Sequence, residues 1–191
     1  MNVKKWAASL MIIVGAAYAS YSALHFIWQR QIVNEIKPVA SKPVVIDKKK
    51  QLIWEERPTQ GEHFADLIIP NLNAQIPIIE GTNEDELEQG IGHYAGSVLP
   101  GEHDNSVLSG HRDTVFRRIG ELKVGDEIHV RAQQDTFVYR ITKTWITKPD
   151  DRTVIVSHDE PILTLTTCYP FQYVGTAPER YIIQSKLVTS K

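Results

Sequence analysis

The chain has 191 residues, a formal net charge of −2 and a single cysteine, a size that suits one domain with appendages. Residues 61–191 hold twelve Lys/Arg against nineteen Asp/Glu and show no basic stripe, which argues against nucleic acid as a partner. The sequence contains no phosphate-binding loop, no dinucleotide fingerprint, no second cysteine and no His-x-x-x-His pattern, so it predicts neither a nucleotide cofactor nor a metal site.

An apolar segment opens the chain. The twenty-four residues between Lys5 and Arg30 include no Asp, Glu, Lys or Arg, a length that suits a membrane-spanning helix. Trp6 and Trp28 stand where interfacial aromatic side chains would anchor such a helix. We therefore expect 1–28 to form a cytoplasmic tip and a single transmembrane anchor, with the rest of the chain outside the cell membrane.

Two features of the following residues bear on this expectation. The Ala-Tyr-Ala sequence at 17–19 fits a small-x-small cleavage pattern, so a cleaved signal peptide is the alternative to the anchor. Residues 29–60 contain three prolines and a Lys48–Lys50 run without a sustained period, which predicts a stalk or linker. Within it, Trp54 and the two residues before it could pack on the domain.

From His63 the sequence reads as short β segments. The expected strands are 67–69, 76–79, 106–109, 126–130, 136–146, 153–156, 162–166 and 180–184. One short helix is expected from Asn83 to Gln89, with Asn83 as its cap and Gly90 ending it. Seven or eight short strands separated by turn residues predict a mainly all-β fold, a closed or nearly closed eight-stranded barrel over 61–191.

Cys168 is the first candidate for chemistry. It closes the run Thr164–Cys168 at the end of an expected strand, where Pro170 forces the chain to turn. Outside the cell, a lone thiol has no disulfide partner and is open to oxidation, so it is expected to be either buried or used. A nucleophilic thiol needs a nearby base or cation, whereas a structural cysteine acts as a small apolar residue, and both interpretations stay open from position alone.

Two further side chains could serve such a thiol. His111 follows an expected buried strand, and it differs in this from His93, which stands in a turn region. Arg180 begins the last expected strand, and a hairpin with the strand of Cys168 would bring the two residues to the same end of the barrel. Their alternative roles are a satisfied strand-end histidine and a surface ion-pair partner of Glu179.

The acidic residues of the short helix raise the question of calcium. Carboxylates are the ligands that calcium prefers, but acids in a first helical turn also favour the helix dipole. The residues concerned are Glu84, Asp85, Glu86 and Glu88. We expect no cofactor, with calcium as the alternative.

Three motifs together resemble the sortases, the membrane-anchored cysteine transpeptidases of Gram-positive bacteria. The run Thr164–Cys168 fits the family's Thr-Leu-x-Thr-Cys signature, and Leu108–Thr114 looks like the segment that bears the family histidine. Arg180 falls where the family arginine belongs, and Tyr169–Phe171 together with Gly92–Tyr94 looks most like class D.

The resemblance implies a reaction and its participants. Cys168 would attack the scissile carbonyl of a sorting signal similar to Leu-Pro-x-Thr-Gly (LPXTG) on a surface protein, forming a thioacyl enzyme. His111 would exchange protons with the leaving and incoming amines, and Arg180 would stabilise the oxyanion. An amine of a cell-wall (peptidoglycan) precursor would resolve the intermediate. The residues that could line the Leu-Pro groove, or simply pack, are Tyr169, Phe171 and Tyr173.

Other functions stay open beside this one. A pilin-polymerising sortase would use a pilin lysine as the nucleophile, although residues 29–63 lack the Asp-Pro-aromatic lid motif common in that group. A thiol hydrolase would release the product instead of transferring it. A catalytically silent, membrane-tethered β-barrel binding module would use none of the three residues.

Overall fold

The computed structural model describes residues 11–24, 54, 56–133, 135–172, 175 and 177–190. Residues 11–24 form an exposed helix. Within the described part of the chain, no helix combines the length and the apolar character needed to cross a membrane. Half of the expected anchor over 1–28 and most of the expected linker over 29–60 lie outside the described residues, and both stay predictions.

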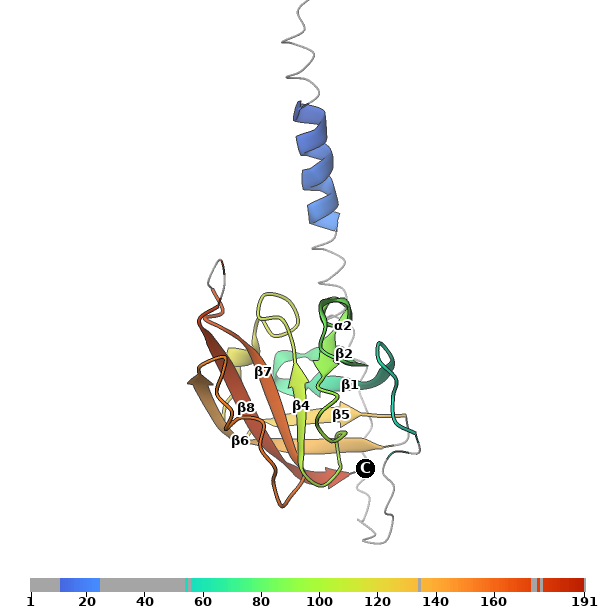
Figure 1. The fold of residues 1–191 in the computed structure, drawn as a ribbon, viewed down its shortest axis with the longest axis vertical. Coiled ribbons are helices and arrows are strands. Elements are labelled where there is room, and N and C mark those ends of the chain that lie inside the picture. Colours follow the sequence, from blue (N-terminus) through green and yellow to red (C-terminus); the bar gives the residue numbers. More distant parts are fainter. Residues whose placement is uncertain are drawn as a thin grey trace, which may run out of the picture.

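Eight strands close into a barrel in the spatial order β1-β2-β3-β4-β7-β8-β6-β5 (Figure 1). Neighbours are antiparallel except for two parallel pairs, β2 with β3 and β4 with β7. The strands are β1 (His63–Ile69), β2 (Ala74–Glu80), β3 (Ile91–His93), β4 (Asn105–Ser109), β5 (Glu127–Arg131), β6 (Thr136–Thr147), β7 (Ile162–Tyr169) and β8 (Glu179–Ser190). The predicted mainly-β closed barrel is confirmed.

Alternation along the strands builds the core. Ile128 and Val130 of β5 are fully buried, and so are Phe137, Tyr139 and Ile141 of β6, while the residues between most of them are more exposed. Successive side chains of a strand point to opposite faces, so this spacing directs one apolar row into the barrel. Burial raises the pKa of the Tyr139 hydroxyl, which accepts a hydrogen bond from the Gly101 N–H.

The strand predicted over 153–156 is wrong. The Thr153 N–H donates to Asp151 in a turn, and the carbonyls of Val154 and Val156 accept from the Asn105 side-chain amide. These backbone groups are therefore satisfied without a neighbouring strand. The eighth strand is instead β3, which was predicted as a turn region and is identified by its partners β2 and β4.

The short helix α2 (Glu84–Gln89) is confirmed. Asn83 caps it, and the Glu86 carboxylate accepts from the Asn83 N–H, which completes a capping box. Gly90 ends the helix in an extended conformation, and a side chain there would come within 2.4 Å of the Pro77 carbonyl. Glycine at position 90 thus serves a close approach of two backbones.

Trp54 packs onto the barrel, as its apolar context suggested. Its ring meets Phe64 edge to face at 5.4 Å between centroids and lies 6.1 Å from Phe137. The indole N–H donates to the Pro100 carbonyl at 2.8 Å. The part of the chain that contributes to the barrel core therefore includes Trp54, ahead of the first strand.

Candidate active site

Three neighbouring strands bring Cys168, His111 and Arg180 to one end of the barrel. In the antiparallel pair of β7 and β8, Cys168 lies opposite Arg180. In the parallel pair of β4 and β7, Ser109 lies opposite Thr166, and the Gly110 N–H donates to the Thr166 carbonyl at 3.2 Å. His111 follows Ser109 by two residues, and Cys168 follows Thr166 by two residues. Adjacent strands lie about 4.8 Å apart, so the three residues share one small region.

Thr167 fixes the backbone between Cys168 and His111. Its side chain is buried, and its hydroxyl donates to the Gly110 carbonyl at 2.6 Å. A Cβ on Gly110 would lie 2.7 Å from the Phe116 ring, so glycine allows this aromatic ring to pack under the turn. Cys168 itself is half-buried and has no disulfide partner. Cys168 thus follows directly after a side chain that joins β7 to the turn after β4.

His111 meets a carboxylate that the sequence did not suggest for it. Its Nε2 lies 3.5 Å from a Glu84 carboxylate oxygen at the start of α2. The His111 side chain is 34% exposed and that of Glu84 73%, so the pair is open to solvent and screened by it. Position in the sequence marks Glu84 only as a first-turn acid, because its contact depends on how α2 sits beside the turn after β4.

Arg180 keeps its charge free of the described carboxylates. Its Nη1 donates to the Glu179 carbonyl at 3.0 Å and to the Ala177 carbonyl at 3.4 Å. Among the described residues, no ion pair involves Arg180, and the alternative partnership with Glu179 is not made through its carboxylate. A half-buried guanidinium opposite a thiol is placed to interact with negative charge that develops there.

The candidate groove residues form an aromatic cluster. Phe171 meets Tyr169 and Tyr181 edge to face at 5.4 and 5.2 Å, and Tyr169 stacks on Tyr181 at 6.2 Å. Phe171 also packs over Gly120, where a Cβ would approach its ring to 2.5 Å. Both a packing role and a groove role fit these contacts, and Tyr173 lies outside the described residues.

His93 has a structural role in the barrel. It is 1% exposed, its Nδ1 lies 2.6 Å from Glu80, and its Nε2 lies 3.0 Å from the Val98 carbonyl. The pair joins the ends of β2 and β3, and His93 lies opposite Leu108 of β4.

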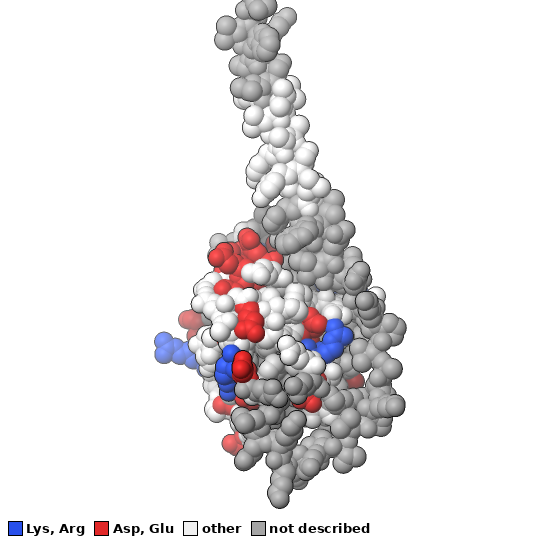
Figure 2. Space-filling view, turned by 90° about the vertical axis from the view of Figure 1, so that its right-hand side faces the viewer, with Lys and Arg blue, Asp and Glu red and all other residues white. Residues whose placement is uncertain are grey.

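The acidic residues of α2 are the candidate ligands for calcium. Figure 2 shows acidic side chains gathered where α2 lies in Figure 1, and Glu84, Asp85 and Glu88 are the exposed acids of that helix. Within the described ranges, no group of three or more His, Cys, Asp or Glu residues is arranged to hold a metal ion. The Glu86 carboxylate is engaged by Asn83 and Gln60, and calcium stays an untested alternative.

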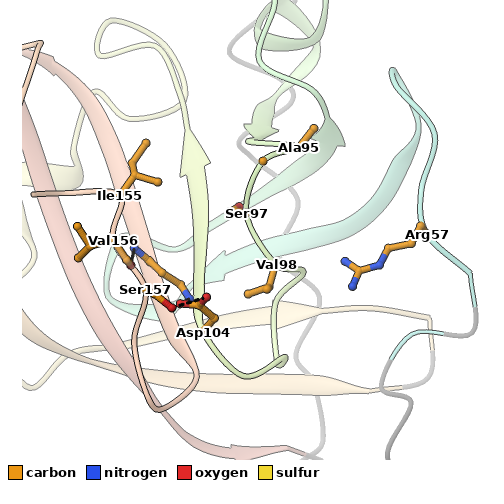
Figure 3. Close-up of a pocket in the computed structure, with 10 residues that line it drawn as sticks. Arg57, Ala95, Ser97, Val98, Asp104, Ile155, Val156 and Ser157 are labelled. Atoms are coloured by element: carbon orange, nitrogen blue, oxygen red, sulfur yellow. Dashed lines mark hydrogen bonds between the residues drawn. The ribbon is translucent and has the colours of Figure 1, made fainter. Parts of the chain in front are cut away.

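A recess of about 500 Å³ lies at the Asn105 end of β4, whereas His111 follows the other end of that strand (Figure 3). Arg57, Asp104 and the exposed side chains of Ile155 and Val156 line it. Its walls contain none of the three candidate catalytic residues, and Asp104 precedes β4 whereas His111 follows it. The recess is therefore separate from the end of the barrel where Cys168 lies.

Comparison with known proteins decides the family. The family model described as the sortase domain matches residues 67–188. The chain belongs to the sortase family. It is 42% identical to Sortase D of Bacillus subtilis over 98% of this chain and all of that protein. Sortase SrtE1 of Streptomyces coelicolor is 33% identical over 69% of this chain and 42% of its own length.

Solved sortase structures share the fold. A Sortase D5 transpeptidase from Clostridium perfringens superposes with a TM-score of 0.63 at 34% identity, covering 70% of this chain and 83% of that one. The SrtF sortase from Corynebacterium diphtheriae gives a TM-score of 0.65 at 28% identity, covering 78% and 93%. The resemblance to sortases, and to class D among them, is confirmed.

Proposed function

We propose that this sortase is a membrane-anchored cysteine transpeptidase that joins surface proteins to the cell wall. Residues 1–28 would anchor it with the N-terminus in the cytoplasm, 29–60 would form a stalk, and 61–191 would act outside the membrane. The substrate would be a protein that ends in an LPXTG-like sorting signal. No cofactor is required by the steps below.

The first step is acyl transfer to the enzyme. The Cys168 thiolate attacks the carbonyl carbon of the scissile peptide bond, and the carbonyl oxygen takes up the negative charge. The Arg180 guanidinium stabilises this oxyanion. When the tetrahedral intermediate collapses, the C–N bond breaks and protonated His111 gives its proton to the leaving amine. A thioester on Cys168 remains.

The second step regenerates the enzyme. An amine of a cell-wall precursor attacks the thioester carbonyl and loses a proton to His111, now neutral. The C–S bond breaks, a new amide forms, and Cys168 leaves as the thiolate beside protonated His111. Wall anchoring is preferred to pilin polymerisation because residues 29–63 lack an Asp-Pro-aromatic lid motif.

The observation that supports this proposal most is the strand register. Cys168 lies opposite Arg180, and on the neighbouring strand Ser109, two residues before His111, lies opposite Thr166, two residues before Cys168. A nucleophile, a proton carrier and a permanent cation at one end of the barrel are the groups that this acyl transfer requires.

Single substitutions test the assignment. We expect Cys168→Ala, His111→Ala and Arg180→Ala each to lower kcat/KM for a sorting-signal peptide by at least about 100-fold. The three substitutions remove, respectively, the nucleophile, the proton carrier and the cation that stabilises the oxyanion. The assay uses the full-length chain in detergent, a panel of sorting-signal peptides, an added amine and mass spectrometry of the acyl enzyme. Circular dichroism checks that each variant keeps the β fold.

The assay also separates the alternatives. Product that carries the amine supports a transpeptidase, while hydrolysed peptide at saturating amine supports a hydrolase. A wall-precursor amine that outcompetes a pilin lysine peptide supports wall anchoring. Turnover by the Cys168→Ala variant at the wild-type rate would overturn the mechanism.

A further inference from the structure

Arg112, the residue after His111, bridges to the loop that joins β7 and β8. Its Nη2 donates to the Gly175 carbonyl at 2.8 Å, and its Nη1 lies 3.3 Å from the Pro170 carbonyl. Pro170 is the first residue after β7, and Gly175 lies in the second half of the loop over 170–178. One side chain thus contacts two separate points of this connection.

The loop needs such a contact because strand pairing does not fix it. Nine residues separate Tyr169 from Glu179, more than the usual hairpin connection of two to five. The Phe171 ring fixes the first part by packing over Gly120. Charge-assisted hydrogen bonds from a planar guanidinium are stronger than neutral ones and hold two acceptors in one geometry. A lysine ammonium lacks this fork.

The loop also connects two members of the proposed catalytic set. Cys168 and Arg180 lie one residue inside the strands at either end of it, opposite each other. Arg112 donates its hydrogen bonds to this loop from the turn after β4, the turn that also carries His111. The position of the loop relative to His111 is therefore set through Arg112.

We propose that Arg112 is a positioning residue for the substrate, which holds the β7–β8 loop against the His111 segment and so shapes the groove for the sorting signal. The inference rests on the proposed function and deepens it. Arg112 does not touch the reacting atoms in this assignment. Its loss loosens the groove and leaves the thiol, the imidazole and the oxyanion cation in place.

The experiment compares Arg112→Lys and Arg112→Ala with Arg117→Ala in the full-length chain. Arg117 is the matched control, an exposed arginine in the same segment whose side chain forms no hydrogen bond or ion pair with the other described residues. We expect both Arg112 variants to raise KM for a sorting-signal peptide by about ten-fold, because a loosened groove misplaces the substrate. We expect kcat and the rate of Cys168 alkylation by iodoacetamide to stay within about two-fold of wild type, since the reacting groups keep their frame.

Hydrogen exchange supplies a readout that needs no turnover. The backbone amides of 171–177 should exchange faster in both Arg112 variants and at the wild-type rate in Arg117→Ala. Unchanged exchange in Arg112→Ala would show that Arg112 does not hold the loop. Unchanged KM, or alkylation that slows in parallel with kcat, would overturn the positioning role. If the wild-type chain processed no sorting-signal peptide, the proposed function would fail, and the exchange rates would still decide whether Arg112 holds the loop.

Discussion

Glu84 places a carboxylate beside the proposed catalytic histidine, and its exposure limits what that carboxylate contributes. The pair is separated by 3.5 Å, and 73% of the Glu84 side chain is open to solvent. Exposed ion pairs contribute between nothing and about 1 kcal/mol. We therefore predict that Glu84→Gln lowers kcat/KM by about five-fold or less, a small change beside that of His111→Ala.

Salt dependence tests whether that small effect is electrostatic. The difference between wild type and Glu84→Gln should shrink as ionic strength rises from about 0.01 M to 1 M, because the screening length falls from about 30 to 3 Å. Glu88→Gln serves as the control, since Glu88 is an exposed acid of the same helix. A loss of 100-fold or more that persists at high salt would mean that Glu84 takes part in proton transfer.

At the scale of the elements, Asp104 ties the start of β4 to the loop before β7. Its carboxylate accepts from the His158 N–H at 2.7 Å, from the Ser157 hydroxyl at 2.9 Å and from the Asn105 N–H at 2.8 Å. Its φ of +119° is a rare conformation for a residue other than glycine. The hydrogen bond from the His158 N–H, followed by that from Ser157, lowers the pKa of Asp104 below its usual range.

This lowered pKa predicts a pH-dependent stability. The ionised carboxylate stabilises the fold above the pKa of the unfolded chain, about 3.9, and the contribution is lost as pH falls through the lower folded value. Asp104→Asn keeps the shape and tolerates positive φ but cannot ionise. We expect its urea midpoint to lie below that of wild type at pH 7 and to converge with it near pH 2. A constant gap at both pH values would contradict the role of the charge.

The elements also show which parts of the fold the sequence could predict. The strands β5 and β6 were predicted because their core residues recur at every second position. Strand β3 was missed because its three residues carry no alternation and depend on β2 and β4 for their hydrogen bonds. The apolar run at 154–156 resembles a strand, but the Asn105 side chain satisfies its carbonyls.

Only some residues of the candidate site could likewise be predicted from the sequence. Cys168, His111 and Arg180 were recognisable because each lies in a contiguous motif with a family pattern. The contacts of Glu84 and Arg112 were not foreseen, because each joins segments that are distant in sequence and meet only once the barrel has closed. The candidate catalytic residues can be predicted from local sequence motifs, whereas the residues that contact them are known only from the closed barrel.

For the molecule as a whole, the chain ahead of the first strand contributes to stability through Trp54. The ring packs against Phe64 and Phe137, and its N–H is satisfied by the Pro100 carbonyl. Full burial of a tryptophan contributes about 3–5 kcal/mol relative to alanine, and Trp54 is half-buried, so we expect Trp54→Ala to cost roughly 2 kcal/mol.

A fragment that starts at residue 61 should therefore be less stable than one that starts at residue 50. Urea unfolding of both fragments, and of the longer one with Trp54→Ala, measures this. Because the substitution should reproduce most of the loss caused by truncation, equal midpoints for the two wild-type fragments would show that the barrel is complete without Trp54.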